Sequence, residues 1–81
     1  MFYVYILKSI YYGKYYIGQT ENIEKRMMEH NSGKVNFTSR FIPWELELCI
    51  NKASRKEAII LERKLKNLNR EDLEEFITKY R

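Results

Sequence analysis

Hydrophobic positions divide the chain into segments with two different periods. Residues 2–7 and 15–18 combine aromatic and β-branched side chains in short runs, which favours strands, and Gly13 between them suits a turn. The two runs therefore predict an antiparallel hairpin. Residues 44–50 alternate apolar with acidic side chains and then become wholly apolar, which is typical of a third strand with one solvated face for most of its length.

Three further segments show the spacing and end signals of helices. Asn22 is a suitable N-cap for the first, which ends at the glycine C-cap signal Asn31-Ser32-Gly33. Ser54 and Glu57 match a capping box that opens the second, and Asn69 can cap the third. The expected core-facing residues are Ile23, Met27 and Met28 in the first helix, Ala58, Leu61, Leu65 and Leu68 in the second, and Leu73, Phe76, Ile77 and Tyr80 in the third.

Residues 34–43 have no clear period, close on a proline and predict a loop. The element order is then β-β-α-β-α-α. This order predicts an α+β fold, a small three-stranded antiparallel sheet flanked by helices, in one domain spanning residues 1–81.

Composition and charge limit the functional classes to which the chain can belong. The formal net charge is +4, and the basic residues gather between residues 51 and 70, ahead of an acidic group at 71–75. The basic segment could face a polyanion such as nucleic acid, or it could be a solvated helix surface. Cys49 is the only cysteine, so neither a disulfide framework nor a paired-cysteine zinc site is expected. With no membrane-length apolar run and no leader-like start, we expect a cytoplasmic protein that does not bind membranes.

Arg26 and His30 lie four residues apart on the first predicted helix and so share a face. Taken singly, the arginine could be a packed rim residue and the histidine a packed or surface residue. Together, and downstream of a tyrosine-rich strand, they suit chemistry, because imidazole has an unperturbed pKa of about 6.5 and can transfer protons near neutrality.

Glu62 is the most unusual carboxylate, because it follows the core position Leu61 and is surrounded by basic residues. It could simply pair with Lys66 one helical turn later. As a functional residue it would be a metal ligand, since Mg²⁺ often takes one or two protein carboxylates and fills its shell with water and phosphate oxygens.

Tyr5 and Tyr16 could be core aromatics or reactive phenols. Lowering a phenol's pKa by three units to reach neutrality requires about 4 kcal/mol of differential stabilisation. A guanidinium and a divalent cation nearby could supply that, whereas an apolar sheet face could not.

These residues together resemble the GIY-YIG nuclease family, especially its short single-domain bacterial members related to excision-repair nuclease catalytic domains. The run Tyr16-Ile17-Gly18 matches the second half of the motif, while Tyr3-Val4-Tyr5 departs from the first half at its first two positions. Arg26 and His30 fall where the family keeps an arginine and a histidine or tyrosine, and Glu62 falls where it keeps a metal-binding glutamate.

The resemblance implies a metal-dependent endonuclease that hydrolyses phosphodiester bonds, usually in DNA, around one Mg²⁺ or Mn²⁺ ion, with a role in DNA repair. Glu62 would hold the metal and Arg26 would stabilise the transition-state charge. Tyr5 or Tyr16, with His30, would activate the attacking water, and the sequence leaves open which of the three is the base.

Three cations, Lys14, Arg40 and Lys66, are candidates for contacting phosphates. The alternative function is a nucleic-acid-binding module of the same fold that does not cut. A more remote reading is an interaction protein whose basic helix binds an acidic partner. The sequence leaves RNA open as a substrate and does not indicate an oligomeric state.

Overall fold

A three-stranded antiparallel sheet separates two small cores in the computed structural model, which describes residues 1–81. The strands follow the order β2-β1-β3 across the sheet. In chain order the elements are β1 (Phe2–Ser9), β2 (Tyr15–Thr20), α1 (Ile23–Asn31), the 3₁₀ helix η1 (Thr38–Phe41), β3 (Trp44–Lys52), α2 (Arg55–Lys66) and α3 (Arg70–Tyr80). The predicted α+β class and element order are confirmed, with each strand slightly longer than the sequence indicated.

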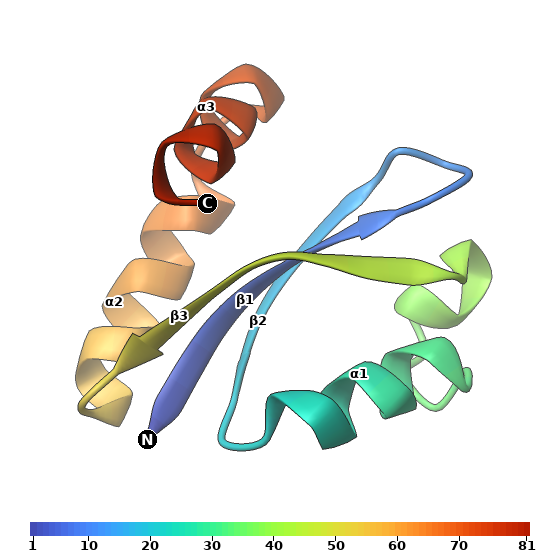
Figure 1. Cartoon of the computed structure of the whole chain (residues 1–81), viewed down its shortest axis with the longest axis horizontal. Coiled ribbons are helices and arrows are strands. Elements are labelled where there is room, and N and C mark those ends of the chain that lie inside the picture. Colours follow the sequence, from blue (N-terminus) through green and yellow to red (C-terminus); the bar gives the residue numbers. More distant parts are fainter.

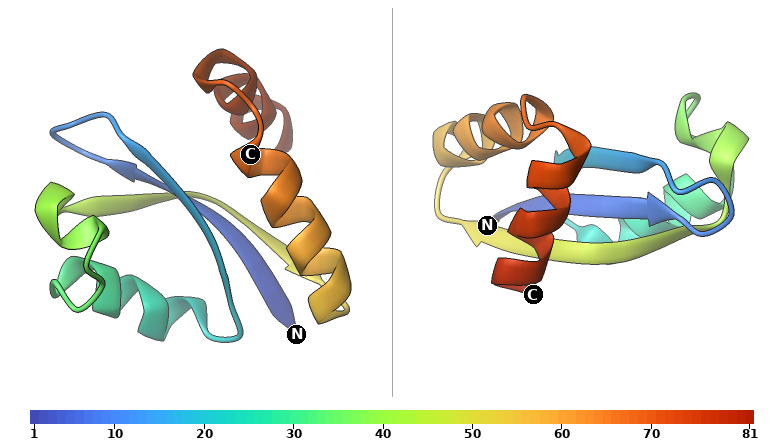
Figure 2. Two further views of the ribbon diagram at one scale, coloured as in Figure 1. Left: turned by 180° about the vertical axis from the view of Figure 1, so that it is seen from behind. Right: turned by 90° about the horizontal axis from the view of Figure 1, so that it is seen from above.

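Helices cover both faces of the sheet. Helix α1 and η1 lie on one face, and α2 and α3 lie against the other (Figure 1). Figure 2 shows the same separation from behind. None of the helices is long and apolar enough to cross a bilayer.

The central strand β1 supplies both cores because its side chains alternate. Val4 and Ile6 pack with α2 and α3, whereas Tyr5 and Leu7 pack with α1. All four are at most 1% exposed. The tyrosine of the candidate site is therefore held at the centre of the sheet on the α1 face.

A β-bulge in β3 moves that strand's apolar residues from one face to the other. The pairing of β1 with β3 shifts between Ile6 and Leu7, which leaves Glu47 as an extra residue in β3. One inserted residue reverses the facing of the side chains beyond it. Trp44 consequently packs on the α1 face and Leu48 in the opposite core. The predicted solvated face thus changes sides within the strand.

The helix ends follow the sequence signals. Side chains of Asn22, Ser54 and Asn69 each accept a backbone N–H as N-caps. At the end of α1, Gly33 adopts a φ of 84°, and the N–H groups of Gly33 and Lys34 donate to the carbonyls of His30 and Glu29, the Schellman pattern. The predicted glycine C-cap is confirmed.

Three sequence expectations about these segments need correction. Met28 is 73% exposed and Tyr80 is 54% exposed, so neither belongs to a core-facing stripe. Residues 34–43 are not wholly irregular, because they contain η1 and bury Thr38 completely. The Thr38 carbonyl accepts the indole N–H of Trp44 at 2.8 Å, which fixes this segment against the sheet.

Candidate active site

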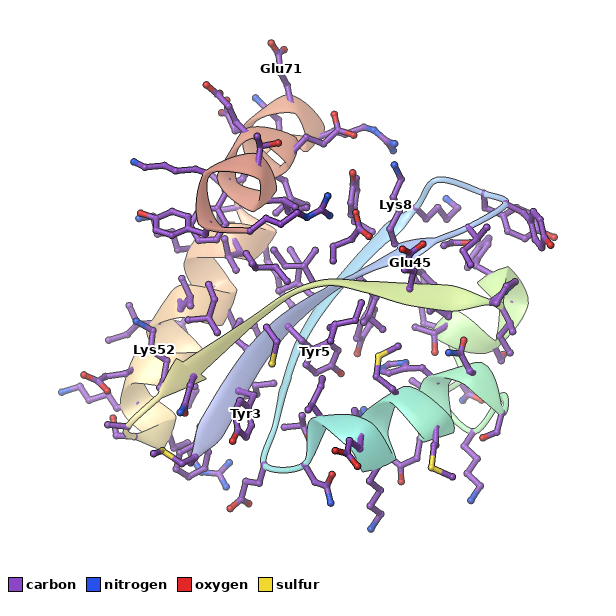
Figure 3. The ribbon with its side chains drawn as sticks, viewed as in Figure 1. Tyr3, Tyr5, Lys8, Glu45, Lys52 and Glu71 are labelled. Atoms are coloured by element: carbon purple, nitrogen blue, oxygen red, sulfur yellow. The ribbon has the colours of Figure 1, made fainter.

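The hydroxyl group of Tyr5 lies at the centre of the candidate site. Its side chain points from β1 toward α1 (Figure 3) and its cross-strand partner is Gly18. A Cβ atom on residue 18 would lie 2.6 Å from Tyr5 Oη and 2.8 Å from Cζ. The phenol therefore occupies the space in which any other residue would place its side chain, and this close approach requires glycine.

His30, in the last turn of α1, contacts the Tyr5 hydroxyl group. The two side chains meet at 2.9 Å between Oη and Nε2, and His30 is fully buried. The unperturbed pKa of about 6.5, on which the sequence argument relied, does not apply at this buried position. Burial, followed by the nearby Arg26 charge, lowers the pKa of His30 to about 4, so its imidazole is neutral at pH 7.

The direction of the hydrogen bonds through His30 follows from Thr38. Its hydroxyl lies 2.8 Å from His30 Nδ1 and donates to the carbonyl of Val35 at 3.3 Å. We assign that hydroxyl proton to Val35, so Thr38 accepts from Nδ1–H and Nε2 accepts from the Tyr5 hydroxyl. A buried chain of donors therefore runs from the Tyr5 phenol through the imidazole to Thr38.

Arg26 approaches the same phenol from one turn earlier on α1. Its Nε donates to Tyr5 Oη at 3.4 Å and its Nη1 contacts Glu29 at 3.1 Å. Burial raises the pKa of Tyr5 to about 12, and the Arg26 hydrogen bond opposes this only in part. At rest the phenol is protonated, so the guanidinium alone does not produce the lowered pKa that the sequence argument considered. The Arg26 side chain is 33% exposed and emerges at the predicted rim.

Tyr16 forms the more accessible wall of this group. Its ring packs edge-on to His30 with centroids 4.9 Å apart, and it lies 6.3 Å from the Tyr5 ring. The residue is only partly buried. The structure thus brings Tyr5, Tyr16, Arg26 and His30 together, as the sequence predicted.

Glu62 reaches this region from the other face of the sheet. Its carboxylate accepts from Gln19 Nε2 at 2.9 Å and pairs with Lys66 Nζ at 2.7 Å. Gln19 belongs to edge strand β2 and, by alternation, points toward α2 rather than α1. Glu62 therefore does not contact the phenols, although its charge contributes to the raised pKa of Tyr5. Its side chain is 17% exposed and lines a cavity of about 360 Å³, so it is not sealed in apolar packing.

A family model described as the GIY-YIG catalytic domain matches residues 1–78. The chain belongs to the GIY-YIG family. Members of this family are nucleases. The predicted resemblance is confirmed.

Named relatives of this GIY-YIG chain are UPF0213 proteins. A UPF0213 protein of Bacillus licheniformis is 36% identical over 80 residues, covering 98% of this chain and 81% of the relative. One from Streptococcus pneumoniae is 39% identical over 67 residues, covering 82% and 68% respectively. The NMR structure of a UPF0213 protein from Bacillus halodurans superimposes with a TM-score of 0.63 at 32% identity, covering 96% of this chain and 84% of that one.

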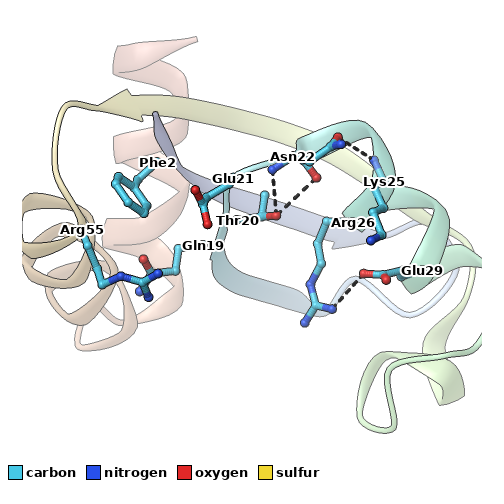
Figure 4. A pocket seen from close by; sticks show the side chains of 9 residues that line it. All are labelled: Phe2, Gln19, Thr20, Glu21, Asn22, Lys25, Arg26, Glu29 and Arg55. Atoms are coloured by element: carbon cyan, nitrogen blue, oxygen red, sulfur yellow. Dashed lines mark hydrogen bonds and ion pairs between the residues drawn. The ribbon is translucent and has the colours of Figure 1, made fainter.

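An open cavity of about 380 Å³ adjoins the GIY-YIG residues between the starts of α1 and α2 (Figure 4). Arg26 and Gln19 both line it, so the cavity connects the Tyr5 group with the residue that holds Glu62. Lys25 and Arg55 add two cations, and sequence reasoning did not select either of them. The signal for Lys25 was its place beside Arg26 in the first helix, whereas Arg55 required the tertiary structure.

The cations predicted to contact phosphates are dispersed. Lys66 pairs with Glu62, while Lys14 and Arg40 lie beside aromatic rings at the hairpin and η1. They flank the GIY-YIG group rather than forming one patch.

The available metal ligands fit one hard cation with few protein donors. No three His, Cys, Asp or Glu side chains are grouped as a metal site. Glu62 offers one accessible carboxylate, and Gln19 offers a neighbouring amide oxygen. This set suits Mg²⁺, which keeps waters and substrate oxygens in most of its positions. Lys66 would have to leave the carboxylate, which its 54% exposed side chain allows.

Proposed function

We propose that this chain is a metal-dependent endonuclease that hydrolyses phosphodiester bonds in DNA around one divalent ion, Mg²⁺ or Mn²⁺. The observation that carries the proposal is the buried series Tyr5–His30–Thr38, which begins beside Arg26 at an open cavity. A protein that only bound nucleic acid would need surface cations but no buried acceptor for a phenolic proton.

The roles follow from these contacts. Arg26 lines the cavity and its Nε donates to the buried Tyr5 hydroxyl, so Tyr5 would position the guanidinium that binds the phosphate. As water attacks phosphorus it would lose its proton to solvent in the open cavity, while His30 Nε2 accepts from the Tyr5 hydroxyl and holds that phenol against Arg26. Thr38 accepts from Nδ1 and keeps the imidazole oriented. Tyr5 and His30 thus stay uncharged, which fits the raised pKa of the phenol and the lowered pKa of the imidazole.

Glu62 would hold the divalent ion, with Gln19 beside it at the cavity wall. Such an ion would supply charge neutralisation at the phosphate. Arg26 would share that work through its fixed donor fork. Tyr16, partly exposed beside His30, would contact the phosphate or the attacking water.

One observation favours a second candidate, a nucleic-acid-binding module that does not cut. Both carboxylate oxygens of Glu62 already have partners within the protein. A role in DNA repair and a cytoplasmic location stay predictions.

A nicking assay on plasmid DNA tests the proposal. With Mg²⁺ or Mn²⁺ we expect cleavage that EDTA stops and that Glu62→Gln reduces about a hundredfold or more, because charge neutralisation at the phosphate is lost. Binding of DNA should survive in that variant. Glu57→Gln, an exposed position on the same helix, is the matched control and should cut normally.

The outcomes separate the candidates. Binding without cleavage under either metal would support the non-cutting module. Cleavage that persists in purified Glu62→Gln would remove Glu62 from the mechanism.

A further inference from the structure

Three aromatic rings extend outward from Tyr16 along the surface, and we refer to Tyr12, Phe37 and Phe41 as the aromatic shelf. Phe37 stacks against Tyr16 with centroids 6.2 Å apart and planes inclined by 29°. Phe41 follows at 5.7 Å from Phe37, and Tyr12 at 5.4 Å from Phe41. The shelf joins the hairpin end to η1, which lie close together in Figure 1. It therefore begins at the candidate active site.

The shelf is exposed although its backbone is fixed. Phe37 is 54% exposed and Tyr12 is 59% exposed, so neither ring is needed to fill a core. The segment beneath them is held in place, because Ser9 Oγ donates to the Phe41 carbonyl at 2.6 Å and the indole of Trp44 donates to Thr38. Exposed aromatic rings on a rigid support are a feature of binding surfaces.

The charges around the shelf favour an anionic ligand. Lys14 Nζ lies 5.0 Å from the centre of the Phe41 ring. Arg40 lines a cavity of about 470 Å³ together with Phe37 and Phe41, and no acidic residue lines it. A ligand with flat rings and negative charges, which is to say a nucleotide, matches this combination.

We propose that the aromatic shelf stacks an unpaired base next to the phosphate being cut, so that the preferred substrate is single-stranded or locally unpaired DNA. The proposal rests on the proposed nuclease function and names its substrate class. In a duplex the faces of the bases are covered by their neighbours, and only the edges and backbone are presented. The exposed face of Phe37 can therefore receive a base only from a strand that is not paired at that nucleotide.

Fluorescence anisotropy with EDTA present can measure stacking apart from cutting. The probes are a thymidine oligonucleotide of about 12 nucleotides, an abasic strand of equal length and phosphate count, and a duplex of that length. We expect the thymidine strand to bind about 5- to 150-fold more tightly than the abasic strand, and the duplex no more tightly than the abasic strand.

Four variants test whether Phe37 is responsible for the preference for the thymidine strand. Phe37→Ala and Phe37→Leu should both lose the preference for the thymidine strand, since leucine keeps apolar surface but no ring. Phe37→Trp should retain it. Met28→Ala removes a still more exposed apolar side chain from α1, 73% against 54% for Phe37, and should leave every affinity unchanged. Thermal unfolding of each variant checks that the fold is intact, which the exposure of residue 37 leads us to expect.

The two proposals fail in different ways. A wild-type protein that binds thymidine and abasic strands equally, or Phe37 variants that keep the preference, would overturn the stacking role while any metal-dependent cutting still supported the nuclease. A retained preference without cutting in Mg²⁺ or Mn²⁺ would overturn the nuclease and leave the shelf as a binding surface.

Discussion

Replacing Gly18 with alanine should disable the candidate site through one misplaced methyl group. The added Cβ would lie 2.6 Å from Tyr5 Oη and 3.2 Å from Tyr16 Cε2, and ordinary Cβ contacts begin near 3.4 Å. The Tyr5 hydroxyl would have to retreat by about 0.8 Å. The buried His30 Nε2 already lies 2.9 Å from Tyr5 Oη, so the hydroxyl has no free space into which it can move.

The expected magnitudes follow from that collision. Overpacking of this size costs about 1–3 kcal/mol of unfolding free energy, or about 5–20 °C in Tm for a domain of this length. A shift of about 1 Å in reacting groups can lower a rate about a hundredfold. We therefore expect Gly18→Ala to remain folded at 20 °C and to cut plasmid DNA about a hundredfold more slowly than wild type.

Gly33→Ala provides a matched control. Residue 33 has a φ of +84°, and its nearest atoms to a new Cβ lie 3.9 Å away. Alanine there is strained by about 1–2 kcal/mol but touches nothing in the site. Both variants should lose stability, and only Gly18→Ala should lose activity. Cleavage at the wild-type rate by folded Gly18→Ala would refute the idea that the close approach positions Tyr5.

Two further predictions concern His30 and its support. The pKa of His30 lies near 4 in the folded protein and at about 6.5 in the unfolded chain, so the unfolded chain binds the proton first as the pH falls. The free energy of unfolding should keep its full value above pH 6.5 and fall by up to about 3 kcal/mol toward pH 4. Urea unfolding of His30→Gln should show a smaller fall over the same pH range. An equal fall in wild type and variant would contradict the lowered pKa of His30. Thr38→Val leaves a buried Nδ1–H without an acceptor and should cost about 1–3 kcal/mol and slow cutting, whereas Thr38→Ser should keep both. Equal unfolding free energies for the two Thr38 variants would show that this hydrogen bond is unimportant.

Local signals in the sequence determined most of the secondary structure. Three side-chain caps, at Asn22, Ser54 and Asn69, are formed by residues a few positions from their partners, so no distant contact was needed to predict them. Strand alternation similarly placed Tyr5 and Val4 on opposite faces. The resemblance in turn gave the family, which the match over residues 1–78 confirms.

The candidate site was predictable where it is built from one continuous stretch. Arg26 and His30 share a face of α1, and the turn after β2 sets that helix beside the Tyr5 side chain. Thr38 was missed because residues 34–43 have no period from which a buried position could be recognised. The aromatic shelf was missed for the same reason, because Phe37 and Phe41 meet the hairpin only in the folded chain.

By itself, the sequence determined the element types, the caps, the family and which side chains can carry the chemistry, because these depend on residue type and on neighbours within a few positions. Only the tertiary structure decided how those side chains behave. Burial disfavours the charged forms of both Tyr5 and His30. The bulge at Glu47 determines on which face of the sheet Trp44 lies. Glu62 lies across the sheet edge, joined to the cavity through Gln19. Each of these depends on solvent exclusion or on contacts between residues far apart in the chain, which no local pattern encodes.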